Sequence, residues 1–216
     1  GFLHCAGMDP RKPLNWKRTI AANGEYGCMG DRGMHVLHVP LRAGWMPRNV
    51  HAVLSNIVAQ RPDPTTGKLA ACETWDNATL LCEAQDAEGK SFPLTVKTQR
   101  IAPGETNTWY LTIKGTRFSA HYTTRNANAL ETLTYERGRP QVWATEYTGT
   151  EGAVYKGITG GIFQMGFSDA LMQMIAAFCH EVAAGPGVSV PFACATPQET
   201  QQAHAVFTAA LRSHAE

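Results

Sequence analysis

The chain has 216 residues, which is more than one average domain and less than two, so its length allows one large domain or a domain with an appendage. Hydrophobic residues make up 44% of the sequence and charged residues 17%, with a mean hydropathy of -0.24. This composition excludes a disordered chain, and no apolar run approaches the roughly 18–20 residues that cross a bilayer. We therefore expect a globular chain with no membrane partner.

Nineteen Lys and Arg residues against eighteen Asp and Glu residues give a formal net charge of +1. The sequence has no basic block, so we predict no nucleic-acid partner. The six cysteines form no CxxC pair, and a chain of this length needs no disulfide to hold a core. Reduced thiols and the lack of a visible targeting signal predict a cytoplasmic protein.

Residues 1–30 are typical of loops and end in a run of spaced glycines that includes Gly24, Gly27 and Gly30. A phosphate cradle would require GxGxxG after a strand or GxxxxGK[ST], and neither occurs in the sequence. The glycines therefore predict tight turns and close approach of the backbone to a neighbour.

A helix is predicted over residues 31–44, with Asp31 as a candidate N-cap. Its apolar positions, Val36, Leu37 and Leu41, suit one buried stripe. Pro40 removes a backbone hydrogen bond, so we expect the helix to kink or tighten there.

Short β-rich runs dominate the middle of the chain, between residues 50 and 148. The predicted strands cover 50–59, 78–86, 91–101, 107–115, 117–124, 130–136 and 141–148. The connections at 86–90 and 114–116 are too short for a crossover helix, so they predict hairpins between antiparallel neighbours. Residues 61–68 are predicted to form an exposed excursion.

Two further helices are predicted over residues 167–184 and 197–214. The first carries a helical stripe that we expect to lie in the core. Its apolar residues are Leu171, Met174, Ile175, Phe178 and Val182. The order of elements predicts an α+β fold with an open, mostly antiparallel sheet and the helices on one face.

Asp31 and His35 are four residues apart, which places a carboxylate and an imidazole on the same face of a helix. A carboxylate beside a histidine favours the charged ring, so the pair is suited to acid/base chemistry on a substrate hydroxyl. The spacing alone favours a structural interpretation at this point, with Asp31 only capping the helix and His35 hydrogen-bonded near the core.

His38 extends the row, and Asp31, His35 and His38 together are compatible with a divalent metal in a lyase or isomerase. No HExxH-like arrangement accompanies them, so we predict no bound metal. No GxSxG motif is present, and covalent catalysis has no support.

Trp16, Lys17 and Arg18 combine a flat aromatic ring with two cations, which suits an anionic or ring-shaped ligand. A surface tryptophan packed on its own strand is at least as compatible with the sequence. Arg100 is a second polar candidate that either lies near a site or caps a strand.

Four stretches in this order resemble the C-terminal domain of the Gfo/Idh/MocA family of NAD(P)-dependent oxidoreductases. They are Asn15–Lys17, Gly30–His35, Gly160–Ala170 and Pro191–Pro197. The resemblance covers nearly the whole chain. It implies an α+β domain with an open, largely antiparallel sheet, like the C-terminal domain of glyceraldehyde-3-phosphate dehydrogenase, that supplies the substrate site and the face of a homodimer or homotetramer.

The family's DxGxH motif falls on Asp31, Gly33 and His35. The resemblance implies that His35 is the acid/base at a hydroxyl of a sugar or polyol, and that Asp31 assists it or binds substrate. The family's Trp-Arg becomes Trp16-Lys17, which keeps a cation near the cofactor. Where the family commonly has an aspartate, this chain has His38, so substrate contacts there are in doubt.

Substrate binding is assigned on these grounds to Trp16, Lys17, Arg18, His38 and Arg100. Cofactor contacts are assigned to Trp16 and Lys17. The resemblance implies NAD or NADP in a longer protein, with the Rossmann domain upstream of residue 1. We expect residues 1–216 to form a single substrate-binding and dimerisation domain that is inactive alone and binds no cofactor. A non-catalytic binding or dimerisation module remains the alternative.

Overall fold

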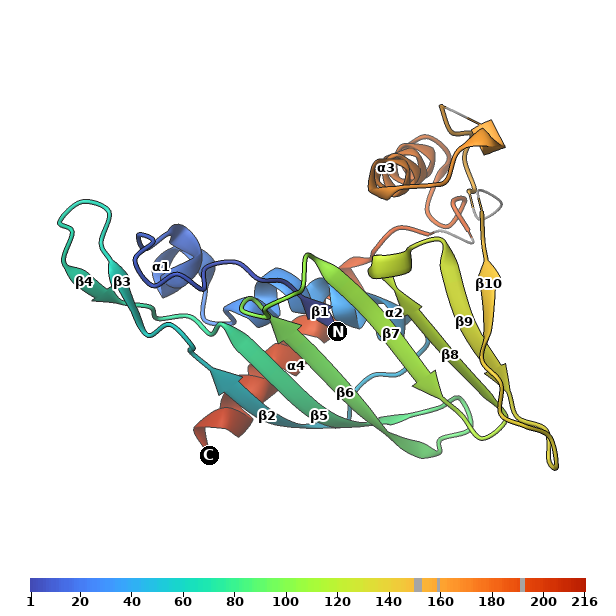
Figure 1. The fold of residues 1–216 in the computed structure, drawn as a ribbon, viewed down its shortest axis with the longest axis horizontal. Helices are drawn as coiled ribbons and strands as arrows, with labels where there is room; N and C mark the ends of the chain where they lie inside the picture. Colours follow the sequence, from blue (N-terminus) through green and yellow to red (C-terminus); the bar gives the residue numbers. More distant parts are fainter. Residues whose placement is uncertain (150–152, 159, 191–192) are drawn as a thin grey trace. The chain divides into compact units, whose positions relative to one another are not determined.

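A computed structural model describes residues 1–149, 153–158, 160–190 and 193–216 (Figure 1). The chain forms two compact units: unit 1 comprises residues 1–109 and 197–216, and unit 2 comprises residues 110–196. That the chain acts as one substrate-binding and dimerisation domain stays a prediction.

The sheet of unit 1 is open and mainly antiparallel, with the strand order β7-β1-β6-β5-β2. Its strands are β1 (Phe2–Leu3), β2 (Asn49–Ser55), β5 (Asn77–Gln85), β6 (Ser91–Gln99) and the start of β7 (Thr108–Lys114). β5 pairs antiparallel with β2 and β6, whereas β1 runs parallel to β6. A separate hairpin of β3 (Gln60–Pro62) and β4 (Leu69–Ala71) flanks the predicted excursion.

Helices cover one face of this sheet. They are the π-helical turn η2 (Met29–Gly33), α2 (Met34–Arg42) and α4 (Pro197–Ala215), and the short helices η1 (Trp16–Arg18) and α1 (Ile20–Asn23) precede them in the chain. α4 packs against β2, and α2 packs against both α4 and β6 (Figure 1). The helix predicted from residue 31 therefore begins inside a π turn, and it continues through the buried Pro40 for two more residues.

The core of unit 1 lies between these helices and the sheet. Alternate residues of β5 are buried, as expected for a strand with one face on a core. The core residues from α2, α4 and the strands are Val36, Leu37, Leu41, Ala52, Leu54, Ala78, Leu80, Cys82, Val96, Ala203, Val206, Phe207 and Ala210. The buried stripe predicted for the first helix is thus confirmed.

Two glycines confirm the expected close approach of the backbone. Gly27 has φ +57°, and a Cβ there would lie 2.6 Å from the backbone nitrogen of Trp75. A Cβ on Gly33 would lie 2.6 Å from the ring of Phe207, so this glycine allows η2 and α4 to pack closely.

Unit 2 contains an antiparallel meander followed by a helix. Its elements are the rest of β7, β8 (Phe118–Thr123), η3 (Thr124–Asn126), β9 (Ala129–Thr134), β10 (Ala144–Tyr147), η4 (Gly160–Ile162) and α3 (Phe167–Ala184). β8 pairs with β7 and β9, and β9 pairs with β10. Both predicted hairpins are confirmed, one in each unit.

α3 has the predicted bounds, but the prediction that its apolar stripe lies in the core is wrong. The five stripe residues are between 42% and 71% exposed. Helical periodicity reports that one face is apolar, and it does not report what covers that face. Of the resembling stretch 191–197, Pro191 and Phe192 lie outside the described residues.

The predicted fold class is confirmed: an α+β fold with an open, mostly antiparallel sheet. Among the residues that the structure describes, no helix is both long and apolar enough to span a membrane.

Candidate functional site

Lys17 and Asp31 form an ion pair at the surface of unit 1. Lys17 lies in η1, whose N-cap Asn15 accepts a hydrogen bond from the Lys17 backbone at 3.1 Å. The Lys17 Nζ donates to the two carboxylate oxygens of Asp31 at 3.2 and 3.3 Å. The Trp-Lys stretch and the aspartate of the DxGxH motif therefore meet in space.

Asp31 is surrounded by cations. Its carboxylate also accepts a short hydrogen bond from Arg32, and it lies 3.8 Å from the Nη2 of Arg100. Burial alone would raise the pKa of Asp31, but Arg32, Lys17 and Arg100 outweigh it and hold this pKa below its ordinary value. Asp31 is not the helix N-cap that the sequence suggested, because Gly33 occupies that position.

Arg100 stabilises the main chain of Lys17 through a hydrogen bond. It lies just after β6 and is buried, and its Nη1 donates to the backbone carbonyl of Lys17 at 3.0 Å. The hydroxyl of Thr74 donates to the same carbonyl at 2.7 Å. Arg100 thus contacts the main chain of Lys17 and the side-chain surroundings of Asp31, which places it near the site rather than at a distant strand end.

His35 lies one helical turn beyond Asp31, in α2, with an exposed side chain. Its ring meets the ring of Phe2 edge-on at 5.5 Å. The indole of Trp109 donates to the backbone carbonyl of His35 at 2.9 Å, which ties this position to the sheet.

In the described part of the chain no hydrogen bond or ion pair joins Asp31 to His35. The sequence placed these side chains on one face but could not show that Lys17 and Arg32 compete for the carboxylate. A direct carboxylate–imidazole contact is therefore not present in this structure.

Trp16 and Arg18 flank Lys17 with different surroundings. The Trp16 side chain is 60% exposed, and the Lys17 Nζ lies 5.2 Å from its ring centroid. Arg18 is buried and forms an ion pair with the buried Asp76. A substrate contact by Arg18 stays a prediction, and its buried guanidinium has little surface with which to make one.

His38 contacts α4. Its Nδ1 lies 3.3 Å from the carboxylate of Glu199, which also accepts a hydrogen bond from Arg42 at 2.9 Å. Burial and the charge of Arg42 hold the pKa of His38 below its ordinary value, against the opposing effect of Glu199.

Asp31, His35 and His38 do not converge on a point. Among residues 1–149, 153–158, 160–190 and 193–216, no group of three or more His, Cys, Asp or Glu side chains is placed to hold a metal ion. The alternative of a metal-dependent lyase or isomerase therefore lacks its ligand set here.

His4 belongs to this neighbourhood and was missed in the sequence. It follows β1, and its Nδ1 accepts a hydrogen bond from the backbone of Asn107 at 3.1 Å. Burial, then the nearby Arg32 and Lys17, lower its pKa, while Asp31 acts in the opposite direction. No sequence pattern marks His4, because a two-residue strand has no recognisable period.

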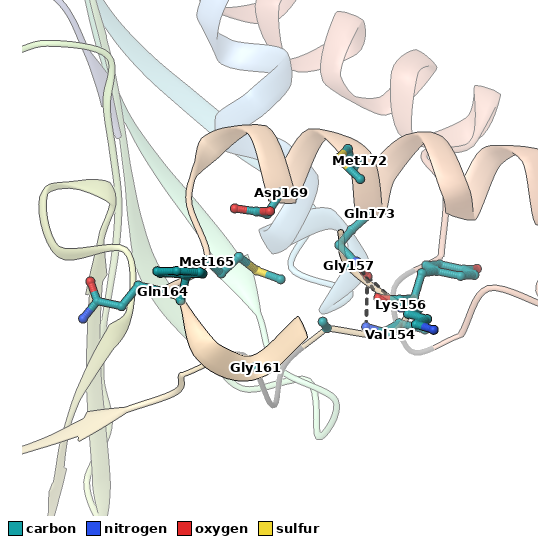
Figure 2. A pocket seen from close by; sticks show the side chains of 12 residues that line it. Val154, Lys156, Gly157, Gly161, Gln164, Met165, Asp169, Met172 and Gln173 are labelled. Atoms are coloured by element: carbon teal, nitrogen blue, oxygen red, sulfur yellow. Dashed lines mark hydrogen bonds between the residues drawn. The ribbon is translucent and has the colours of Figure 1, made fainter. Parts of the chain in front are cut away.

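Unit 2 has a hollow of its own between α3 and the segment preceding it (Figure 2). The buried side chain of Gln173, on α3, holds this segment against the helix through three hydrogen bonds. Its amide oxygen accepts from the backbone nitrogens of Val154 and Tyr155 at 3.0 and 2.8 Å, and its amide nitrogen donates to the Tyr155 carbonyl. Asp169 accepts a hydrogen bond from the backbone of Gly166. These polar groups hold the backbone, so we assign no chemistry to the hollow.

Comparison of the sequence with protein-family models and with curated proteins gives no match. The fold, by contrast, matches solved oxidoreductase structures. A levoglucosan dehydrogenase in complex with NADH and levoglucosan has a TM-score of 0.78 and 22% identity, with 99% of this chain and 55% of that chain covered. An NAD binding oxidoreductase from Klebsiella pneumoniae has a TM-score of 0.78 and 21% identity, with 100% and 55% covered.

An inositol dehydrogenase homologue from Azotobacter vinelandii, complexed with NAD+, has a TM-score of 0.71 and 17% identity, with 98% and 54% covered. This chain spans about half the length of each of these structures. The chain therefore shares its fold with these oxidoreductase structures, as the resemblance predicted.

Proposed function

We propose that this chain is the substrate-binding and catalytic part of an NAD(P)-dependent oxidoreductase of the Gfo/Idh/MocA family, acting on a hydroxyl of a sugar or polyol. One observation carries the proposal: Lys17 and Asp31, 14 residues apart, form an ion pair within one helical turn of the exposed His35. These are the positions that the resemblance assigns to the reaction, and they lie on a fold shared with NADH-binding dehydrogenases.

His35 is the proposed base. Imidazole is the side chain that most often exchanges protons near neutral pH, and the exposed ring of His35 is accessible to a substrate hydroxyl. Oxidation of the hydroxyl would pass its O–H proton to His35 and the hydride of its carbon to the dinucleotide, and a carbonyl would form. The Trp109 hydrogen bond holds the His35 backbone in place for this transfer.

Asp31 is proposed to act as a fixed anion rather than as a proton acceptor. Its lowered pKa keeps it ionised at neutral pH, where it orients the ammonium of Lys17. Lys17 in turn is available to hydrogen-bond a substrate oxygen through the exposed part of its side chain.

A dinucleotide would contact this chain only in part, since the glycine-rich fingerprint for its phosphates is missing from the sequence. When bound, a dinucleotide would supply the acceptor for the hydride. We therefore propose that turnover needs an additional dinucleotide-binding domain and that residues 1–216 alone are inactive.

We further propose that the protein assembles as a homodimer or homotetramer in the cytoplasm, through the open face of the sheet. In unit 1 this face carries the exposed Val53 and Leu81, both apolar. Trp109 packs against the core of unit 1, and its indole donates to the backbone carbonyl of His35 in α2.

The test is His35→Asn in the complete gene product, assayed for dinucleotide reduction with sugars and polyols. Loss of the base should lower kcat by roughly 10²–10⁴-fold, with little change in dinucleotide affinity. His204→Asn, an exposed histidine on α4, is the matched control and should keep wild-type kcat. A folded His35→Asn variant with wild-type kcat would remove His35 from the reaction and favour a non-catalytic module.

A further inference from the structure

The surroundings of Asp31 carry a surplus of positive charge. Lys17, Arg32 and Arg100 all lie within 3.8 Å of this carboxylate, and no other described acidic side chain is ion-paired with them. Three cations against one anion leave a formal surplus of two positive charges. Arg32 and Arg100 are only 7% and 3% exposed, so water screens their charges weakly.

The two buried arginines also have unsatisfied donors. Within the described residues, the Nε of Arg32 and both the Nε and the Nη2 of Arg100 have no hydrogen-bond partner. The Nη1 of Arg100, on the other side of its guanidinium, is occupied by the Lys17 carbonyl. Buried cations with few acceptors favour a further anion in this neighbourhood.

The positive charge of this cluster reaches the protein surface at Lys17. The side chain of Lys17 is 37% exposed, whereas the arginines lie behind it. The largely exposed ring of Trp16 adjoins the Lys17 ammonium on the same short helix. A ring-shaped ligand with a negative group would meet a flat apolar surface and an accessible cation at this point.

We propose that the ligand of this site is a sugar acid, whose carboxylate binds the Lys17 ammonium while its ring packs on Trp16. Arg32 and Arg100 strengthen this binding through their charge, without direct contact. The inference rests on the proposed function for the reaction, and it narrows the substrate class from sugars and polyols in general to those with a carboxylate. The shared chemistry is an anionic oxygen group, which the phosphates of a dinucleotide also offer.

Titration calorimetry on the chain at low ionic strength tests the inference, with D-glucuronate and D-glucose as paired probes. One charge-assisted hydrogen bond should make glucuronate bind at least about tenfold more tightly. Added salt should reduce this preference. Lys17→Met should abolish it and Lys17→Arg should keep it. Lys12→Met, which removes an exposed lysine five residues upstream, should leave it unchanged.

Equal affinity for glucuronate and glucose would overturn the inference. Inorganic pyrophosphate serves as the probe for the dinucleotide, and Lys17-dependent binding of pyrophosphate without glucuronate binding would also overturn it. The ligand and the proposed function can be rejected independently of each other. Oxidation of neutral sugars alone, dependent on His35, would keep the function and reject the sugar acid. Lys17-dependent glucuronate binding without any His35-dependent oxidation would keep the ligand and reject the function.

Discussion

The two units differ in where their apolar side chains lie. In unit 1 the strands, α2 and α4 enclose a core that contains side chains as large as Met29 and Phe207. In the described part of unit 2 the buried hydrophobic residues are Ala129, Leu133 and Ala177, while most of the large apolar side chains of α3 are exposed. Unit 1 is therefore stabilised by its own core, whereas unit 2 exposes apolar surface that is available for packing against another protein surface.

The contrast extends to charge. Unit 1 buries four arginines and Asp76, which forms an ion pair with Arg18, the residue that follows Lys17. Such buried charges need a rigid frame, because any loss of a partner leaves an uncompensated charge. We infer that the core of unit 1 holds the site residues, whereas the exposed apolar face of α3 contributes to association.

The largest expected effect comes from matched phenylalanine truncations. Phe207→Ala empties a fully buried position in unit 1 and should lower the free energy of unfolding by about 3–5 kcal/mol. Phe178→Ala removes an exposed ring from α3 and should change it by less than about 0.5 kcal/mol. Urea unfolding of the two variants measures the difference, and similar losses would contradict the contrast between the units.

The second largest loss in the free energy of unfolding should come from Asp31→Asn, because this substitution leaves three cations without their anion. We expect a loss of about 2–3 kcal/mol at neutral pH, less than for a fully buried pair because Asp31 is partly exposed. The pKa of Asp31 is lowered in the folded state, so its stabilising contribution is present above the unfolded value of about 4 and is lost as the pH falls through the folded value.

The difference in unfolding free energy between wild type and Asp31→Asn should therefore shrink below about pH 4. Urea titrations at several pH values measure it. Glu88→Gln, at an exposed turn, is the control, and its unfolding free energy should stay close to that of the wild type at every pH. A difference for Asp31→Asn that stays constant down to pH 2 would show that its ionisation does not contribute.

Glycine packing gives a smaller effect. Gly33→Ala would place a Cβ against the ring of Phe207 and should cost about 1–3 kcal/mol through overpacking. Gly157→Ala in unit 2 is the matched control, because its Cβ would meet nothing within 4 Å. Thermal unfolding distinguishes the two, and equal melting temperatures for both variants would show that the contact between η2 and α4 relaxes freely.

The sequence predicted most of this fold because the elements are marked by local signals. Hairpin turns such as 86–90 and the cap and stop of α3 can be recognised without the tertiary structure. The site was predicted only in part. Asp31, His35 and Lys17 stand in motifs, whereas His4 and the support of Lys17 by Arg100 depend on contacts between distant residues, and no local pattern records such contacts.

The smallest effect on stability, and a sharper test of unit 2, should come from charging the apolar stripe of α3. Ile175→Lys with Val182→Lys should change the unfolding free energy by less than about 0.5 kcal/mol, because both side chains are more than half exposed. If the stripe lies in an interface, the two lysines will be costly to desolvate there, and association will weaken.

Sedimentation velocity at micromolar concentration measures this association for the chain and for the complete gene product. Gln202→Lys, an exposed polar position on α4, controls for added charge. Unchanged sedimentation of the double variant, in a wild-type background that does associate, would assign the interface to another surface such as the open face of the sheet.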